Sequence, residues 1–427
     1  MKHTSGNNGY LICNLQRILQ SLLLCLIPAF AHAQVPDSSA LSIGKWIKIS
    51  VNKEGIYQLS KDKLSSLGFK DPARVKLYGY GLEFLPESNI QNLDNDIKEI
   101  PVWRNSNGTL LFYSCGTTRW YAEDWKVPSQ GTSQIAFHHR NNPYSNSICY
   151  FLTESDNAPA GINKEQSVEG AISVDTYPEH ALIETDEFSY INTGRTFFEK
   201  YDFGGKSTKR YKLDLPGYAG GQVRLDVNFS AAGSSSSTLS VTVNKTKLGT
   251  LSFKSLQEYV YADVQSASYN WSNAHAVNDT IELTHKGASG TTGHLDYIRA
   301  SYMRKLSLAD NKFLVFRSSQ LSSRNIKYNV SGANEYTRVW RITKATSTTE
   351  IPGTLNGNTY SVNAQSTGND KFVAVNVNAT YPEPTIIGKI ENQNLRALHD
   401  IDLVIITPAN GKLNAQAQKL ADEAAKK

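Results

Sequence analysis

The chain has 427 residues and a formal net charge of +5, and its charged residues make up only 19%, below the usual share of about a quarter. The small positive excess is spread along the chain without a basic block, which argues against a nucleic-acid partner. The 22 tyrosines, the 2 methionines and the density of Ser, Thr, Asn and Gly are typical of an extracellular or envelope β protein rather than a cytosolic helical enzyme.

The first 33 residues have the pattern of a cleaved signal peptide. Lys2 and Arg17 form a positive region, residues 18–27 form a short apolar core, and Ala31-His32-Ala33 fits the small-x-small cleavage pattern. The apolar core is too short to span a bilayer. We therefore expect residues 1–33 to be removed and the protein to be exported. Without the two cations the net charge falls from +5 to +3.

The length predicts about two to four domains, and residues 34–170 are expected to form a β-rich first domain. Its strand-like runs lie at 46–51, 56–59, 75–78, 97–103, 110–113 and 148–152. We expect the first two runs to form a hairpin in which Gly55 suits a positive φ angle. Ser60 is expected to cap a short helix that ends near Gly68.

The clearest alternation of apolar and polar residues lies in residues 175–305. Val223, Leu225, Val227 and Phe229 share one face, and similar runs follow at 239–243, 248–253, 281–283 and 295–299. Short strands separated by turn signals predict a β-sandwich of the jelly-roll type. Residues 306–385 predict a further β segment and a linker, with strands at 313–316, 339–342 and 372–377.

The last segment, residues 386–427, has the pattern of a β-α unit. The unbroken apolar run at 403–406 suggests a strand that is buried on both faces of a parallel sheet. A helical pattern follows, with Leu413, Ala417 and Leu420 on one face. Such a strand needs parallel neighbours, so we expect the segment to be the truncated start of an α/β domain. The alternative is an edge strand and a helix that dock onto the preceding β domain.

The pattern predicts no catalytic, cofactor-binding or metal-binding residue. His138 and His139 are adjacent, but neighbours along a strand point to opposite faces and cannot easily ligate one ion. Cys115 or Cys149 could form a thiolate pair with a histidine, although a buried structural cysteine is the simpler interpretation. A disulfide between these cysteines is left open. His399-Asp400 precedes the predicted parallel strand, whereas ligands gather at carboxyl ends.

Aromatic residues of the predicted sandwich could bind a surface glycan by stacking against sugar rings. Sugar stacking needs rings on one exposed face, which the spacing alone does not show, and packing in the core and between strands is the favoured interpretation. The candidates are Tyr211, Tyr218, Tyr259, Tyr261, Tyr269 and Trp271.

Several strings occur here in an order that resembles one protein family. They are WIKISVNKEGIYQLS, VKLYGYGLEFLPE, LLFYSCGTTRW, NNPYSNSICYFLT, HLDYIRASYMRKL, NQNLRALHDIDLVIITP and AQKLADEAAK. The chain resembles the N-terminal part of the type IX secretion system sortases, the PorU family of gingipain-type cysteine peptidases from Bacteroidota, from about Trp46 to Lys427. In this family a segment like NQNLRALHDIDLVIITP opens the caspase-like catalytic domain.

The resemblance implies a place at the outer membrane and a role in cysteine endopeptidase or transpeptidase chemistry. Such enzymes remove C-terminal sorting domains from secreted cargo proteins and work beside an outer-membrane β-barrel partner. No position here matches the catalytic His or Cys, so the chain by itself is expected to be non-catalytic. The alternative is a secreted β-sandwich module that binds carbohydrate or mediates adhesion without enzymatic activity.

Overall fold

The computed structural model describes residues 38–80, 84–85, 96–127, 132–169, 172–192, 194–309, 311–319, 322–344, 347–367, 370–408 and 411–426. The predicted signal peptide, residues 1–33, lies outside them. The chain divides into a compact unit of Gly44–Glu391 and a second unit made of the flanking segments Met1–Ile43 and Asn392–Lys427. In the part of the chain that the structure describes, no helix combines the length and the apolar character that a membrane crossing requires.

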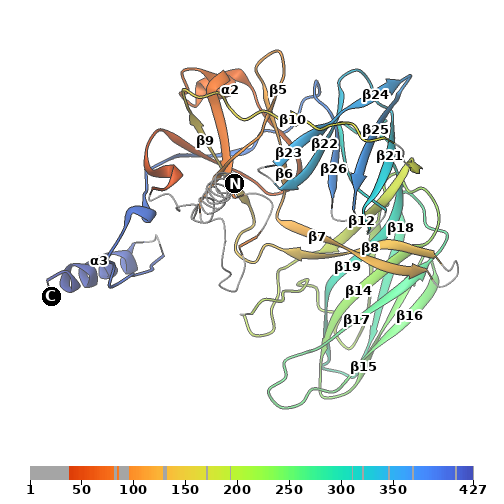
Figure 1. The fold of residues 1–427 in the computed structure, drawn as a ribbon. Helices are drawn as coiled ribbons and strands as arrows, with labels where there is room; N and C mark the ends of the chain where they lie inside the picture. Colours follow the sequence, from red (N-terminus) through yellow and green to blue (C-terminus); the bar gives the residue numbers. More distant parts are fainter. Residues whose placement is uncertain are drawn as a thin grey trace, which may run out of the picture. The chain divides into compact units, whose positions relative to one another are not determined.

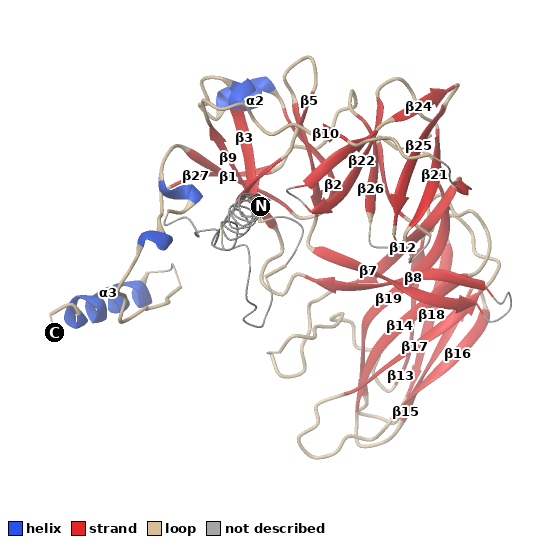
Figure 2. Ribbon diagram, viewed as in Figure 1, coloured by secondary structure: helices blue, strands red, loops and turns tan. Residues whose placement is uncertain are grey.

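The larger unit is mainly β, as the sequence predicts, and most of its strand pairs are antiparallel (Figures 1 and 2). Its first part contains a sheet in the order β27 (Thr385–Ile390), β1 (Trp46–Val51), β9 (Ile148–Glu154), β3 (Val75–Gly79), β4 (Lys98–Ile100). A facing sheet has the order β2 (Glu54–Leu59), β6 (Leu110–Cys115), β5 (Trp103–Arg104), and a separate hairpin pairs β7 (Thr118–Val127) with β8 (Thr132–Asn141). Helix α2 (Lys61–Ser66) and the 3-10 turn Pro72–Arg74 lie between these strands in sequence.

The hairpin that the sequence predicts between the first two strands does not form. β1 pairs with β9 and β27, whereas β2 pairs with β6, so the chain passes from one sheet to the other between them. Both strands place apolar side chains in one shared core, which explains the change of sheet. Gly55 lies within β2 rather than at a positive φ angle, and a Cβ atom there would meet the Phe313 ring at 3.2 Å.

The helix prediction is confirmed. The Ser60 hydroxyl accepts a hydrogen bond from the backbone N–H of Lys63 at 3.1 Å, which satisfies a free donor of the first turn of α2. Gly68 adopts a φ of 80° just beyond the helix, where residues other than glycine are strained.

The middle of the larger unit is a jelly roll. One sheet has the order β12 (Thr176–Glu184), β19 (Thr292–Lys305), β14 (Val223–Ala232), β17 (Asp263–Trp271). The opposing sheet has the order β13 (Lys206–Leu213), β18 (Asp279–Lys286), β15 (Ser237–Val243), β16 (Thr246–Phe253). Consecutive strands alternate between the sheets except at the β15–β16 hairpin, which is jelly-roll connectivity.

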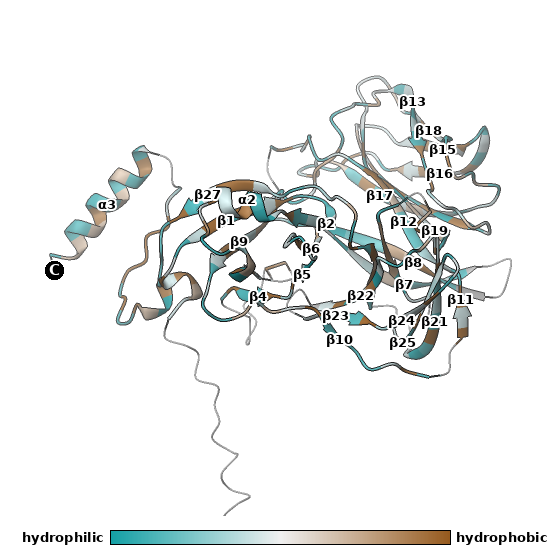
Figure 3. Ribbon diagram, turned by 90° about the horizontal axis from the view of Figure 1, so that it is seen from above, coloured by the Kyte–Doolittle hydropathy of each residue, from teal (hydrophilic) through white to brown (hydrophobic). Residues whose placement is uncertain are grey.

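Alternating side chains give this jelly roll its core. Val223, Leu225, Val227 and Phe229 of β14 are fully buried, as the sequence predicts, and they pack on Leu239, Val241, Ile281 and Leu283 of the opposing sheet. Removing apolar side chains from water is the main favourable contribution to such a core, about 1.5–3 kcal/mol for each large side chain. Figure 3 shows the hydrophobic and hydrophilic residues mixed along the strands.

A second sandwich follows the jelly roll. One sheet has the order β10 (Asn163–Lys164), β23 (Ser347–Ile351), β22 (Thr337–Lys344), β26 (Lys371–Asn376), β20 (Phe313–Arg317). The other has the order β11 (Ile172–Val174), β21 (Arg324–Ser331), β25 (Thr359–Ser366), β24 (Gly353–Asn356). Its strands include those predicted at 313–316, 339–342 and 372–377, and both sheets contribute to one core.

The C-terminal segment differs from the prediction. β27, in the segment expected to open a new domain, pairs with β1 of the first sheet. In the smaller unit, the Leu41 carbonyl of the 3-10 turn Ala40–Ser42 accepts hydrogen bonds from the Gln393 backbone N–H and the Asn392 side chain, just before the 3-10 turn Leu395–Ala397. The predicted helix is present as α3 (Lys412–Ala424), but residues 401–408 form no strand. Without a partner among the described strands, that apolar run cannot satisfy its backbone groups as a sheet.

Candidate functional site

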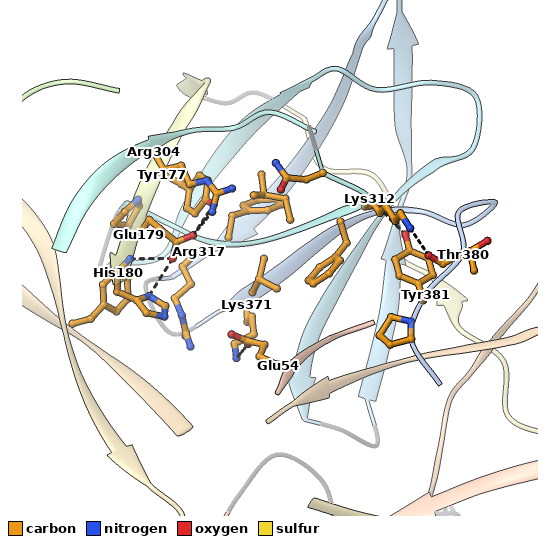
Figure 4. Close-up of a pocket in the computed structure, with 18 residues that line it drawn as sticks. Glu54, Tyr177, Glu179, His180, Arg304, Lys312, Arg317, Lys371, Thr380 and Tyr381 are labelled. Atoms are coloured by element: carbon orange, nitrogen blue, oxygen red, sulfur yellow. Dashed lines mark hydrogen bonds and ion pairs between the residues drawn. The ribbon is translucent and has the colours of Figure 1, made fainter. Parts of the chain in front are cut away.

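A cavity of about 470 Å³ opens in the larger unit where the first β region, the jelly roll and the second sandwich meet (Figure 4). Its walls come from β2, β8, β12, β19, β20 and β26 and from the segment that follows β26. The polar lining residues are Glu54, Tyr177, Glu179, His180, Arg304, Asn311, Lys312, Arg317, Lys371, Thr380 and Tyr381. A pocket with converging polar groups at a meeting of domains is a typical place for a ligand.

Glu54 and Lys371 form an ion pair at the base of this cavity. Each is the first residue of its strand, β2 and β26, so the start of both strands brings the side chains together. Lys371 Nζ lies 2.6 Å from Glu54 Oε1 and 2.9 Å from the Tyr113 hydroxyl oxygen. The Tyr113 hydroxyl donates a hydrogen bond to the same carboxylate. The side chains of Glu54 and Lys371 are 26% and 11% exposed, so water screens the pair weakly.

The pair determines the charge of both groups. Burial alone would raise the pKa of Glu54, but the charge and hydrogen bond of Lys371 outweigh it and hold the pKa at about 2. Burial lowers the pKa of Lys371 and the positive charge of Arg317 lowers it further, while Glu54 opposes both. Glu54 is therefore ionised near neutral pH, and Lys371 is its partner.

Glu179 is held on the opposite wall by donors from several directions. Its Oε2 accepts hydrogen bonds from the Tyr177 hydroxyl at 2.9 Å and from Arg304 Nη1 at 3.0 Å. Its Oε1 accepts one from the backbone N–H of His180 at 3.0 Å. Burial raises the pKa of Glu179, although these donors oppose the shift. The carboxylate is thus fixed in position and paired with Arg304.

His180 contributes a neutral ring to the cavity. Its ring packs against Trp120, with 3.6 Å between ring centroids. Burial lowers the pKa of His180 to about 3. Its Nδ1 lies 3.2 Å from Glu179 Oε1, but the angle does not make a hydrogen bond, and this buried nitrogen has no other partner among the described residues. His180 is therefore neutral, and its Nδ1 is a buried polar atom without a hydrogen bond among the described residues.

Lys312 and Arg317 have no carboxylate partner among the described residues. Lys312 Nζ donates to the Thr380 carbonyl at 2.9 Å, and Arg317 Nη2 donates to the Trp120 carbonyl at 3.3 Å. The described lining therefore carries the cations Arg304, Lys312, Arg317 and Lys371 against the anions Glu54 and Glu179, an excess of 4 − 2 = 2 positive charges. Such a surface attracts anions.

The histidines and cysteines that the sequence analysis weighed lie outside this cavity. His138 and His139 point to opposite faces of β8, with side chains 49% and 5% exposed, as their spacing predicts. Cys115 and Cys149 are both free, so the disulfide left open by the sequence is not formed. Burial raises the pKa of Cys115, which disfavours a reactive thiolate.

The aromatic residues considered for glycan binding do not form one platform. Tyr211 and Trp271 are buried in the jelly-roll core, and Tyr218 and Tyr269 pack partly against it. Only Tyr259 and Tyr261 remain exposed, at 86% and 58%, in the loop between β16 and β17. His399 and Asp400 are also exposed, in the smaller unit.

The described residues also place three carboxylates close together at one end of the jelly roll. Ligand oxygens of Glu184, Asp186 and Asp296 all lie within 4.8 Å of one another, near enough to hold a metal ion. His139 Nδ1 accepts a hydrogen bond from Arg299 Nη1 at 3.2 Å, so its Nε2 carries the proton and faces Glu184 Oε1 at 3.3 Å. Burial and the neighbouring carboxylates raise the pKa of Asp296 to about 7.

A solved structure shares the fold of nearly the whole chain. The crystal structure of dimeric latent PorU from Porphyromonas gingivalis matches 85% of this chain at a TM-score of 0.72 and 23% identity. The fold is PorU-like. The chain spans 34% of the PorU chain, about a third of its length.

Other comparisons add no functional argument. A CBM36 domain of a multidomain xylanase from a termite hindgut metagenome and the insecticidal toxin Cry8Ea1 from Bacillus thuringiensis match parts of the chain, covering 29% and 53% of it. Their TM-scores are only 0.19 and 0.18, and their identities are 15% and 11%. No family model and no curated protein matches the sequence.

The cavity could not be predicted from the sequence, because the charged residues that line it are far apart in the chain. Glu54 lies in β2, Glu179 lies in β12, and Arg317 and Lys371 lie in the neighbouring strands β20 and β26 of one sheet; no short motif contains two of the four. The one weak local indication is that Glu54 and Lys371 each stand at the first residue of a strand.

Proposed function

We propose that this chain is the N-terminal, non-catalytic part of a sortase-like cysteine endopeptidase of the type IX secretion system. The enzyme would remove C-terminal sorting domains from secreted cargo at the cell surface. The observation that carries the proposal is the PorU-like fold over 85% of the chain. The ordered sequence strings of the resemblance support it independently of the fold.

In this proposal the β-rich unit positions the peptidase domain and docks against outer-membrane partners. The reaction itself is acyl transfer, in which a cysteine thiolate attacks the scissile carbonyl and a histidine moves the protons. Neither described cysteine suits that role, because Cys115 is buried and Cys149 lies within the antiparallel sheet of β1 and β9. The catalytic groups are therefore expected outside the described residues.

Deleting the gene in the source organism tests the proposal. We expect secreted cargo proteins to keep their C-terminal sorting domains, which mass spectrometry of the intact cargo and of its C-terminal peptides would show. Restoring the gene should restore the shortened C-termini. Cargo that is shortened normally in the deletion strain would contradict a sortase function.

A glycan-binding module is the second candidate, and the exposed Tyr259 and Tyr261 favour it. Two tyrosines in one short loop could stack on sugar rings. The purified chain would be applied to a glycan array beside the double variant Y259A/Y261A. Binding that the double variant loses would support this function, and no binding across the array would count against it.

A further inference from the structure

Arg317 of β20 and Lys312 just before it have no carboxylate partner among the described residues, and an apolar strip on β20 lies between them. Along β20, the partly exposed residues Phe313, Val315 and Arg317 alternate with the buried Leu314 and Phe316. Alternation places the first three on one face, and they span about 13 Å at roughly 3.3 Å per residue. Arg317 thus lies at one end of this apolar strip and places a positive charge there.

The apolar strip continues on neighbouring segments. Tyr381 and Pro382 line the cavity beside Phe313, and the Phe313 and Tyr381 rings lie 6.3 Å apart. The exposed Lys312 lies at the same end of β20 as Phe313. The cavity therefore combines an apolar wall with cationic groups at both ends of the strip.

We propose that this cavity binds a small oxyanion ligand, a carboxylate or a phosphate monoester attached to an apolar body. Arg317 would bind the oxyanion, because its planar guanidinium can donate two parallel hydrogen bonds to such a group. The apolar body would lie along Val315 and Phe313, with Lys312 at the far end. The cavity volume of about 470 Å³ suits a ligand of this size.

The local charges make an anion a better occupant than a cation or a neutral molecule. Glu54 is already neutralised by Lys371 and Glu179 by Arg304, so a cation would meet two unpaired positive charges. An anion would pair with those charges. The proposal concerns this cavity alone and does not depend on the sortase function.

Calorimetric titration of the purified chain tests the proposal. The probes are N-acetyl-phenylalanine, its uncharged methyl ester and phenyl phosphate. We expect the acid to bind and the ester to bind at least about tenfold more weakly, because a charge-assisted hydrogen bond is lost. Comparing the acid with phenyl phosphate assigns the source of the oxyanion. Equal binding of acid and ester, or no binding of either anion, would overturn the proposal.

Variants locate the binding. Arg317→Gln should weaken binding of the preferred anion about tenfold, and Lys312→Gln about threefold, because the latter residue is exposed to screening water. Arg324→Gln, at an exposed arginine of β21 outside the cavity, is the matched control and should bind as the unaltered chain does. Since Arg317 also contacts the Trp120 carbonyl, folding is checked by near-ultraviolet circular dichroism and with Arg317→Lys, which keeps the charge. Unchanged binding by Lys312→Gln together with unchanged binding by a folded Arg317→Gln would contradict the site.

Discussion

Glu54 and Lys371 form an ion pair that joins the first β region to the second sandwich, and few other residue pairs could take its place. Glu54 begins β2, Lys371 begins β26, and the two are separated by 317 positions in the sequence. A buried ion pair of this kind contributes little net stability compared with apolar residues, but removing one partner leaves the other charge unpaired. The single and double substitutions therefore have different consequences.

We predict that Glu54→Gln destabilises the chain by about 3 kcal/mol, since Lys371 then stays buried beside Arg317 without its anion. Adding Lys371→Met should recover a large part of this loss. Glu282→Gln, which breaks the exposed Arg210–Glu282 pair, is the control and should change stability by less than about 1 kcal/mol. Chemical denaturation measures all three, and equal losses for Glu54→Gln and Glu282→Gln would argue against the buried pair.

Asp296 makes stability depend on pH. Burial and the charges of Glu184 and Asp186 raise its pKa from 3.8 in the unfolded chain to about 7 in the folded protein. The folded state therefore binds the proton more tightly, and this contribution to stability is lost as the pH rises from about 4 through 7.

We predict that Asp296→Asn is more stable than the unaltered chain at pH 8, by about 2 kcal/mol after allowance for solvent screening. The difference should shrink as the pH falls toward 4, where the native carboxyl is protonated. Asp156→Asn, at a fully exposed carboxylate, should give a difference that does not change with pH. Denaturation curves at several pH values check this, and a pH-independent gain for Asp296→Asn would refute the assignment.

Strand β27 and the apolar run at 403–406 are close in the sequence, but β27 is paired in a sheet and the run is not. β27 is hydrogen-bonded to β1 along its length, with a register shift between Lys48 and Ile49. In the run, Leu403, Val404 and Ile406 are 54%, 73% and 93% exposed and form no strand. Burial of such a run would need a partner surface that the described residues do not supply.

We predict that backbone amides of residues 401–408 exchange with solvent much faster than those of β27. The reason is that alternate amides of the edge strand β27 are hydrogen-bonded to β1, whereas the run has no strand partner among the described residues. Hydrogen-exchange mass spectrometry of the purified chain resolves both segments in one experiment. Slow exchange at 403–406 would show that the run is covered.

The sequence predicted elements whose cause is local. The alternating apolar residues of β14, the Ser60 cap and the apolar face of α3 all follow from neighbouring residues, and the jelly-roll prediction rested on several such strands. It did not predict that β1 and β2 belong to different sheets, because Gly55 fits both a turn and a close contact with Phe313. The cavity was beyond local reasoning, since Arg317 and Glu54 meet only through long-range packing.

At the scale of the whole molecule, the larger unit consists of three β layers that pack against one another: the first β region, the jelly roll and the second sandwich. The cavity lies where these layers meet, and the ion pairs Glu54–Lys371 and Arg304–Glu179 line it from different layers. A ligand or partner that binds there would contact several layers at once. This arrangement suits a unit whose role in the proposed enzyme is to position other parts.

The most direct test of the account removes this unit from the working protein. The codons for residues 44–391 would be deleted in frame in the source organism, with the rest of the reading frame unchanged, and the C-termini of surface cargo proteins would be read by mass spectrometry. The account predicts that cargo keeps its C-terminal sorting domain and that the intact gene, supplied in trans, restores its removal. Normally shortened cargo in the deletion strain, with the altered protein present, would contradict the central claim that this unit takes part in cargo processing.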